Sequence, residues 1–230
     1  SRAVTIGGVR RKTLAKVAQA QKSQRVTIDV YPYVASSTVL LPQFVKGSER
    51  TVVAWSDPRP ELAGQELEHI RGTWACSIEE AIERLTPAGG IYYQMHEDDL
   101  RRVLRFPNAM IGSDGLPHDV FPHPRLWGTF PRVLGHYARE LGLFSMEEAV
   151  HRMTGVTASV FDLKGRGLLR AGGFADIVIL DPAKIMDVAN FDEPQRPASG
   201  IDGVLVNGQC VWQDGQSTAA RPGRFLSAGG

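Results

Sequence analysis

The residues best suited to chemistry lie close together in the middle of the chain. The segment Met110-Ile-Gly-Ser-Asp-Gly-Leu-Pro-His118 places a carboxylate, Asp114, where an apolar run ends at glycine. The loop that follows carries His118, His123 and Arg125. A carboxylate at the end of a buried strand can move a proton, and an arginine can hold an anion through two parallel hydrogen bonds. This segment therefore predicts a site for acid–base chemistry on an anionic substrate.

The histidines of the loop do not form a metal-ligand pattern. His118 and His123 are five positions apart in a proline-rich loop, which is no established zinc spacing. We expect them to order the loop or to support the site from behind. The remaining histidines fall on predicted helices or in a predicted insertion, where surface and packing roles dominate: His69, His96, His136 and His151.

Composition excludes several classes of protein. With 230 residues, 43% of them hydrophobic, the chain is large enough to bury a core. Its 26 basic and 25 acidic residues argue against binding to nucleic acid or to an anionic membrane. No apolar run approaches the roughly 20 residues that span a bilayer, and the visible start has no secretory signal. Cys76 and Cys210 are far apart, so we expect no zinc ribbon, no disulfide framework and a cytoplasmic setting.

Predicted helices and buried strands alternate along the chain before and after residues 110–125. Residues 8–24 have the spacing of an amphipathic helix, and residues 26–33 read as a strand stopped by Pro32. Residues 97–105 predict a helix and 108–112 the next strand. This order is typical of βαβ units with a parallel sheet.

An insertion is predicted at about 50–90. It should hold a short strand at 51–55, a helix at 61–70 and a second helix up to about Leu85. The second helix would open with the capping box Ser77-Ile-Glu-Glu80. Two further helices are predicted at 131–141 and 146–161.

The last part of the chain changes character. Residues 165–182 alternate glycine turns with a β-forming run, and residues 201–212 predict a hairpin that turns at Asn207-Gly208. The predicted fold class is α/β. Residues 1–162 would be the C-terminal part of a (β/α)8 TIM-type barrel, and residues 163–230 part of a small β-sandwich.

A complete barrel needs eight strands and typically ~250 residues, so the front half of the predicted barrel is missing from this sequence. The chain starts at Ser1 without a methionine. It could be a cleavage product, the ordered part of a longer protein or one chain of a nicked protein.

Several motifs occur in an order that resembles a known family. They are Asp29-x-Tyr31-Pro-Tyr33, Gly112-Ser-Asp-Gly115, His123-Pro-Arg125 and Gly173-x-Ala-Asp176. From about Gly8 to its end the chain resembles the N-acyl-D-amino-acid deacylases (D-aminoacylases) of the amidohydrolase superfamily. The resemblance implies a metal-dependent hydrolase that uses Zn2+ to split an N-acyl-D-amino acid into a D-amino acid and a carboxylate. In that family the zinc ligands, a cysteine and two histidines, precede the point where this chain begins. We therefore assign no metal ligand inside this chain.

The resemblance also implies roles for four residues. Asp114 would take the proton of the zinc-bound water and later pass it to the leaving amine; otherwise it is a helix cap or a turn residue. Arg125 would hold the substrate α-carboxylate, with help from Tyr31 and Ser37. Without that role, Arg125 is a solvated loop residue and Tyr31 an aromatic lid, and a shift of one position would exchange Ser37 for Ser36.

Nearby residues have simpler interpretations. Arg132 and Arg139 are expected to form structural ion pairs, and Trp127 either walls the pocket or belongs to the core. Residues 30–45 include no Lys, Arg, Asp or Glu. If they line the side-chain pocket, the enzyme should prefer neutral, mainly hydrophobic D-amino acids, because an unpaired buried carboxylate is costly.

Two other functions stay open at this point. One is a cyclic-amide amidohydrolase of the hydantoinase or dihydroorotase type, and the other is a non-catalytic binding protein built on a barrel fragment. The expected partners are a small N-acyl-D-amino acid and the N-terminal half of the same enzyme. Neither nucleic acid nor membrane is expected.

Overall fold

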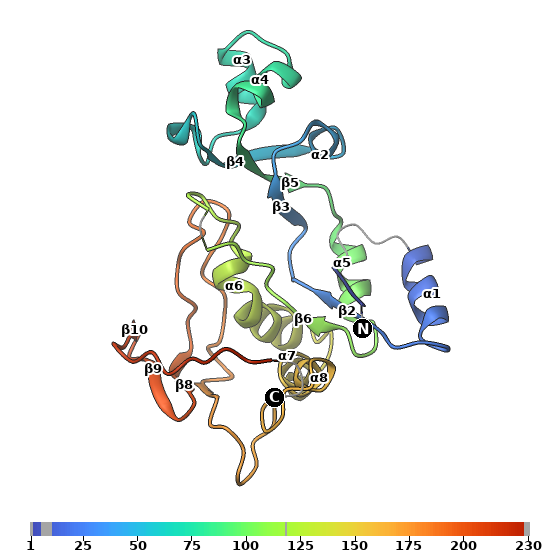
Figure 1. Ribbon diagram of the computed structural model, residues 1–230, viewed down its shortest axis with the longest axis vertical. Coiled ribbons are helices and arrows are strands. Elements are labelled where there is room, and N and C mark those ends of the chain that lie inside the picture. The colour runs from blue at the N-terminus through green and yellow to red at the C-terminus, as the bar shows by residue number, and fades with distance from the viewer. Residues whose placement is uncertain (1, 6–10, 118, 228–230) are drawn as a thin grey trace.

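The computed structural model describes residues 2–5, 11–117 and 119–227. Figure 1 shows three regions, each built on its own sheet: a central parallel sheet with most of the helices, an upper antiparallel lobe, and a C-terminal antiparallel sheet. His118, one of the two loop histidines, lies outside the described residues. Among the helices within these ranges, none is both long and apolar enough to cross a bilayer.

The central sheet is parallel and has the strand order β1-β2-β6. Its strands are β1 (Arg2–Thr5), β2 (Val26–Val30) and β6 (Met110–Ile111). Helix α1 (Arg11–Ala20) connects the first two strands, and α5 (Glu97–Leu104) precedes the third. This arrangement confirms the predicted α/β class, although the strand expected at 108–112 is shorter.

Side-chain alternation gives the central sheet two different faces. Ile28 and Val30 on β2 and Ile111 on β6 belong to a buried core that includes residues of α1 and α5. Since successive strand residues point to opposite faces, Thr27 and Asp29 lie on the other face of β2. One face therefore packs on the helices, and the other carries polar groups.

The first helix after the segment 110–124 begins earlier than the sequence predicts. Helix α6 (Arg125–Arg132) continues without a break into a π-helical turn, η2 (Val133–Glu140), and Pro131 lies inside α6. The sequence predicts a start at residue 131 instead. That prediction was wrong, and its correction places Arg125 on the first turn of a helix instead of in a loop.

The last predicted helix, 146–161, is in fact two helices. They are α7 (Met146–Met153) and α8 (Gly155–Val160), separated by Thr154 with φ −128° and ψ −84°. Ser145 caps α7, since its side chain accepts a hydrogen bond from the Glu148 amide.

The upper lobe is an antiparallel sheet of order β3-β5-β4. It consists of β3 (Ala35–Val39), β4 (Arg50–Ser56) and β5 (Ala88–Tyr93), with helices α2 (Pro42–Lys46), η1 (Pro60–Leu62), α3 (Leu67–Thr73) and α4 (Ile78–Leu85). The capping box Ser77–Glu80 is formed as predicted.

The lobe is wider than the insertion expected at about 50–90, because β3 and β5 had not been predicted. Its sheet runs from residue 35 to residue 93. Two glycines weaken the strand signal of β5, yet Gly89 is needed there because a Cβ would collide with the Trp55 indole. The helix predicted at 61–70 is a 3-10 turn followed by α3.

The C-terminal sheet joins β7 (Ile177–Leu180), β8 (Ile201–Val206), β9 (Gln209–Gln213) and β10 (Gln216–Ser217) in antiparallel order. Asn207 and Gly208 have φ values of 47° and 79°, the left-handed conformation that a two-residue hairpin turn requires. The predicted hairpin is therefore confirmed.

Candidate active site

The candidate site lies where the central strands end. In the register of the parallel pair, Asp29 is opposite Met110 and Val30 opposite Ile111, so β2 and β6 end at the same edge of the sheet. Tyr31 follows β2 directly, and Asp114 lies shortly after the end of β6. The Gly112 amide extends the pairing by donating to the Val30 carbonyl over 3.2 Å. Catalytic groups of α/β barrels gather at this type of edge.

Asp114 and Arg125 form an ion pair at this edge. The Asp114 carboxylate oxygen Oδ2 is 3.0 Å from Arg125 Nη2. The Asp114 side chain is 48% exposed, whereas that of Arg125 is 2% exposed. Asp114 has a left-handed φ of 49°, and it does not cap α6, whose N-cap is Pro124. The structure thus presents one accessible carboxylate and one buried cation side by side.

Arg125 is not a solvated loop residue. Its guanidinium stacks over the Tyr31 ring at 4.7 Å from the centroid, and Nη2 donates to the Ser37 carbonyl over 3.1 Å. Within the described ranges, its Nε and Nη1 atoms are buried and have no hydrogen-bond partner. Buried donors without acceptors are costly, so this guanidinium has unused capacity to bind an anion.

Ser37 rather than Ser36 faces the arginine. Ser37 is buried, and its backbone carbonyl reaches Arg125. The neighbouring Ser36 points to the other side of β3, where its Oγ accepts a hydrogen bond from Gln94 Nε2 over 2.8 Å. The contact seen for Ser37 uses its backbone, and no described residue bonds to its hydroxyl in the structure.

Tyr31 contributes its ring face to the site. The side chain is buried, and burial raises the pKa of its phenol above the ordinary value near 10. The Asp114 and Asp29 carboxylates raise this pKa further, while the Arg125 guanidinium opposes the shift. Tyr31 therefore stays protonated and can donate a hydrogen bond.

His123 orders the loop from behind the site. Its Nδ1 accepts a hydrogen bond from the Arg125 amide over 3.0 Å, and its Nε2 lies 3.1 Å from the Ala35 carbonyl. Burial lowers the pKa of His123 well below the usual 6.5, and the Arg125 charge lowers it further. Because both ring nitrogens are used on backbone groups, His123 has no lone pair left for a metal ion.

Asp29 is a further polar residue of this edge, with no role predicted from the sequence. It lies on the polar face of β2, and a Cβ at Gly112 would come within 2.9 Å of its Oδ2. Burial raises the pKa of the Asp29 carboxyl, and the Asp114 charge raises it too. The signal that could have found it is the two-residue alternation Thr27, Asp29, Tyr31 along the strand.

The neighbouring residues behave as structural elements. Arg132 donates through Nε to the Pro32 carbonyl and lies 3.1 Å from Asp187. Arg139 donates to the Pro182 and Ile185 carbonyls, which are backbone groups rather than the expected ion-pair partner. The Trp127 side chain is 40% exposed and so does not belong to the core.

The described residues do not supply a zinc site. Within them, no group of three or more His, Cys, Asp or Glu side chains could hold a metal ion. Structural zinc sites need about four protein ligands and catalytic sites about three. A metal centre at this edge would therefore need ligands from beyond the described residues.

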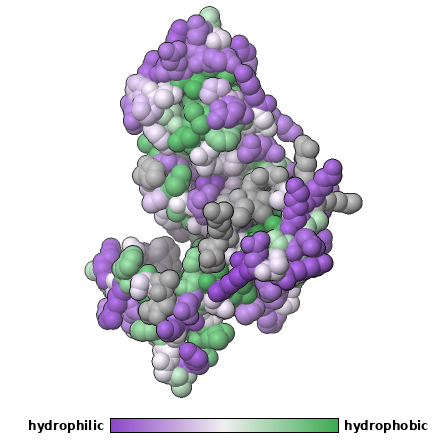
Figure 2. Space-filling model, turned by 45° about the vertical axis from the view of Figure 1, so that its right-hand side comes forward, coloured by the Kyte–Doolittle hydropathy of each residue, from purple (hydrophilic) through white to green (hydrophobic). Residues whose placement is uncertain are grey.

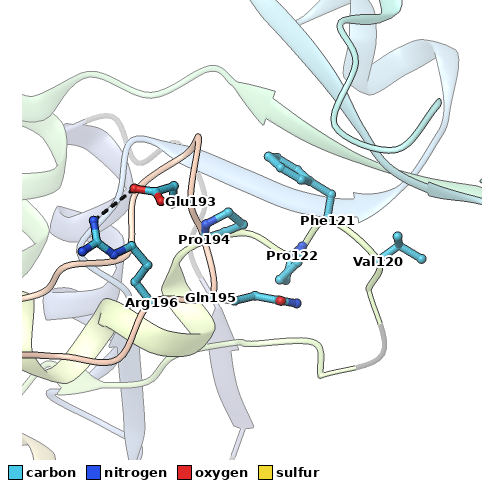
Figure 3. Close-up of a pocket in the computed structure, with 7 residues that line it drawn as sticks. All are labelled: Val120, Phe121, Pro122, Glu193, Pro194, Gln195 and Arg196. Atoms are coloured by element: carbon cyan, nitrogen blue, oxygen red, sulfur yellow. Dashed lines mark hydrogen bonds and ion pairs between the residues drawn. The ribbon is translucent and has the colours of Figure 1, made fainter. Parts of the chain in front are cut away.

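A shallow groove of about 260 Å³ lies beside the site loop. Figure 3 shows it between residues 120–122 and residues 193–196, with Glu193 and Arg196 paired at one end. The nitrogen–oxygen distance of that pair is 3.0 Å. The groove includes neither Asp114 nor Arg125, so it is separate from the candidate active site.

Comparison with known proteins decides the family. A family model described as "Amidohydrolase family" matches residues 5–212. The chain belongs to this family.

Individual relatives agree. A D-aminoacylase of Alcaligenes xylosoxydans xylosoxydans is 51% identical over 220 residues, which cover 96% of this chain and 46% of the relative. A crystal structure of D-aminoacylase, described as defining a novel subset of amidohydrolases, superposes with a TM-score of 0.94 at 47% identity, covering 98% of this chain and 49% of that one.

A second solved structure carries ligands. It is the N-acyl-D-glutamate deacylase from Bordetella bronchiseptica, complexed with zinc and a phosphonate inhibitor that mimics the tetrahedral intermediate. It superposes with a TM-score of 0.92 at 44% identity, covering 98% of this chain and 49% of that one. The chain thus spans about half the length of the relatives that it matches.

Proposed function

We propose that this chain is the C-terminal half of a zinc-dependent N-acyl-D-amino-acid deacylase. The observation that carries the proposal is the accessible Asp114 carboxylate beside the buried Arg125 guanidinium, 3.0 Å apart at the carboxyl edge of parallel strands. One group can move a proton, and the other can bind a carboxylate. Amide hydrolysis of a substrate with a free α-carboxylate needs both.

Arg125 binds and orients the substrate in this proposal. Its Nε and Nη1 groups, which have no partner among the described residues, donate to the α-carboxylate, and Nη2 beside either of them completes a bidentate pair. The Tyr31 ring beneath the guanidinium and the Ser37 carbonyl keep its plane fixed. Binding therefore uses donors that the protein leaves open.

Asp114 carries the proton. An attacking water forms a bond to the amide carbonyl carbon, and its proton passes to an Asp114 carboxylate oxygen. When the carbon–nitrogen bond breaks, the same proton passes to the nitrogen and gives the D-amino acid and a carboxylic acid. The substrate carboxylate takes over the Arg125 charge, so Asp114 is released from its ion pair when the substrate binds.

The zinc ion of this proposal needs ligands from outside the described part of the chain. The roles given above to Arg125 and Asp114 do not require either residue to bind zinc. Support for zinc comes from the zinc-bound N-acyl-D-glutamate deacylase. We propose that an N-terminal half, on the same or a separate chain, brings the ligands.

The surface of the chain supports such a partner half. Both outer strands of the central sheet, β1 and β6, have an unpaired edge in the described structure, and exposed edges are usually covered. On β7, the neighbouring residues Val178 and Ile179 are 54% and 51% exposed, so both faces of this strand reach the surface. Figure 2 shows apolar residues emerging among polar ones on the lower part of the molecule.

We infer that residues 1–162 complete a (β/α)8 barrel with that half, and that residues 163–230 complete a β-sandwich. A cytoplasmic setting stays a prediction, in keeping with the free thiols of Cys76 and Cys210.

The proposed substrates have neutral, mainly hydrophobic side chains. Only part of the segment 30–45 lies near the site, because Leu40 and Val45 are buried in the core of the antiparallel lobe. The nearest cations beyond it are already neutralised. Lys46 lies 3.1 Å from Glu79, and Arg50 lies 2.7 Å from Glu66. An acidic side chain would therefore find no free counter-charge from this wall.

The alternatives are weaker. A hydantoin has no free carboxylate, so a hydantoinase type of enzyme would leave the Arg125 donors without an anion to bind. A dihydroorotase type would use them, since dihydroorotate carries a carboxylate, and an assay with dihydroorotate separates it from a deacylase. A non-catalytic binding protein would not need the Asp114 carboxylate to stay accessible.

The test is a turnover assay of the complete protein, with residues 1–230 alone as the control. We expect N-acetyl-D-leucine to be hydrolysed with a higher kcat/KM than N-acetyl-D-glutamate, no turnover of hydantoins, and neither tight zinc binding nor turnover by the isolated chain. Hydantoin turnover without deacylation would overturn the function, and an advantage for glutamate would overturn only the side-chain preference.

A further inference from the structure

The carboxylate-binding arginine is fixed through its backbone as well as its side chain. The Arg125 amide, on the first turn of α6, donates to His123 Nδ1 over 3.0 Å. The other ring nitrogen of His123 lies 3.1 Å from the carbonyl of Ala35, the first residue of β3. Two positions along the same strand, the Ser37 carbonyl accepts from the Arg125 guanidinium. A single imidazole therefore connects the start of α6 to the strand that also holds the arginine head group.

These contacts allow only one state of the ring. Since the Arg125 amide is a donor, Nδ1 must carry the lone pair, and Nε2 must carry the hydrogen that the Ala35 carbonyl accepts. A protonated imidazole would direct two hydrogens outward, one of them at the Arg125 amide. The neutral tautomer is the form in which both contacts exist, and desolvation lowers the pKa of His123 in the same sense.

Aromatic rings hold the imidazole in this orientation. Phe191, from the segment between β7 and β8, packs against His123 with ring centroids 5.0 Å apart and planes at 75°. Tyr33 lies against the same imidazole at 5.1 Å. Phe191 also contacts Tyr93 on β5 at 5.0 Å. The ring thus sits where the central region, the antiparallel lobe and the C-terminal segment meet.

We propose that His123 is a positioning residue for the carboxylate clamp, which is the Arg125 guanidinium that binds the substrate α-carboxylate. Phe191 keeps the His123 ring in the orientation that this role requires. This inference rests on the proposed function. His123 does not touch the substrate. It fixes the start of α6 relative to β3, so that the guanidinium faces the α-carboxylate while its Nη2 remains on Ser37.

The proposal separates two kinetic effects. A displaced clamp weakens binding of the α-carboxylate in ground and transition states alike, which raises KM and leaves kcat almost unchanged. Substrate analogues whose α-carboxylate is an amide do not use the clamp, and they should not be affected. Substitution of a histidine that only stabilises the fold would not change KM for the acid relative to KM for its amide analogue.

Three substitutions in the complete enzyme test the two hydrogen bonds of His123 separately and together. His123→Gln keeps a donor for the Ala35 carbonyl and loses the acceptor for the Arg125 amide. His123→Asn keeps that acceptor and loses the donor. His123→Phe keeps a ring of similar shape and loses both bonds. His69→Gln, at an exposed position of α3, is the matched control.

We expect KM for N-acetyl-D-leucine to rise about 3- to 10-fold in His123→Gln and less in His123→Asn, as one net hydrogen bond suggests. His123→Phe should raise it about 10- to 100-fold. In all three, kcat stays within about threefold, and His69→Gln behaves as wild type. Phe191→Leu, which leaves both hydrogen bonds possible, gives a smaller rise in KM and covers the case in which His123→Phe does not fold.

Two results would overturn the proposal: unchanged KM in both His123→Gln and Phe191→Leu, or equal losses for the acid and its amide analogue. Failure of the proposed function looks different, because the wild-type enzyme would then not hydrolyse N-acetyl-D-leucine at all.

Discussion

The antiparallel lobe and the parallel central sheet differ in how completely they bury their side chains and pair their strands. In the lobe, β5 is paired on both sides, and α3 and α4 close a core in which Leu67, Leu85 and Tyr92 are at most 1% exposed. The central sheet packs one face on helices, while the other face bears Asp29 and leads to Asp114. The lobe completes its structure locally, whereas the central edge keeps polar groups that need something else to bind.

This difference shows where activity can reside. Groups with unused hydrogen-bonding capacity, such as the buried donors of Arg125, occur at the incomplete edge. Substitutions there should change catalysis more than stability, and substitutions in the lobe should do the opposite. Four predictions test this contrast, in order of decreasing effect.

The largest effect is expected from Asp114→Asn in the complete enzyme. Loss of a proton-transfer carboxylate typically lowers kcat about 10²–10⁴-fold, and the zinc content should remain near that of wild type, because this residue is not assigned as a ligand. Steady-state kinetics and metal analysis check both points. A variant that retains a tenth of the wild-type turnover would remove Asp114 from the mechanism.

Leu85→Ala should show the opposite pattern. Leu85 is fully buried at 0% exposure in the lobe core, and a Leu→Ala change at such a site costs about 2–5 kcal/mol of unfolding free energy. Denaturant unfolding measures the loss, and kcat per folded molecule should not change. A fall in kcat without a loss of stability would contradict the division between the two regions.

Arg125→Lys sharpens the role of the clamp. One lost charge-assisted bidentate contact is worth roughly 1.5–3 kcal/mol, so KM should rise for substrates with a free α-carboxylate and barely change for their esters or amides. Competition assays with matched acid and ester pairs measure the difference. Equal losses for both classes would show that the arginine is only structural.

The smallest effect concerns pH. His123 has a pKa lowered well below 6.5 in the folded state, chiefly by burial, so below about 6.5 the unfolded chain binds more protons than the folded one. The free energy of unfolding therefore decreases as the pH falls below about 6.5, until the pH reaches the pKa of the folded state. Unfolding at pH 8 and pH 5.5 should show this slope in the wild type and a smaller one in His123→Phe. Identical slopes would mean that His123 has the same pKa in the folded and the unfolded protein.

Local signals predicted local features well. The capping box at Ser77–Glu80 and the turn at Asn207-Gly208 were both read correctly, because each depends on atoms a few residues apart. Strands β3 and β5 were missed because their sequences carry a weak strand signal. These strands are stabilised by pairing, β3 with β5 and β5 with β4. The start of α6 was misplaced, since the helix begins at Arg125 and Pro131 lies inside it.

The sequence by itself determined the chemical types at the site: a carboxylate after a strand, an arginine after a histidine and proline, and a tyrosine near the end of the neighbouring strand. The tertiary structure alone decided how they act. The contacts of His123 with Ala35 and of Arg125 with Ser37 each join residues 88 positions apart. Burial, tautomer and unused donors depend on such distant neighbours, because desolvation and hydrogen-bond geometry exist only after β3 and α6 have packed together.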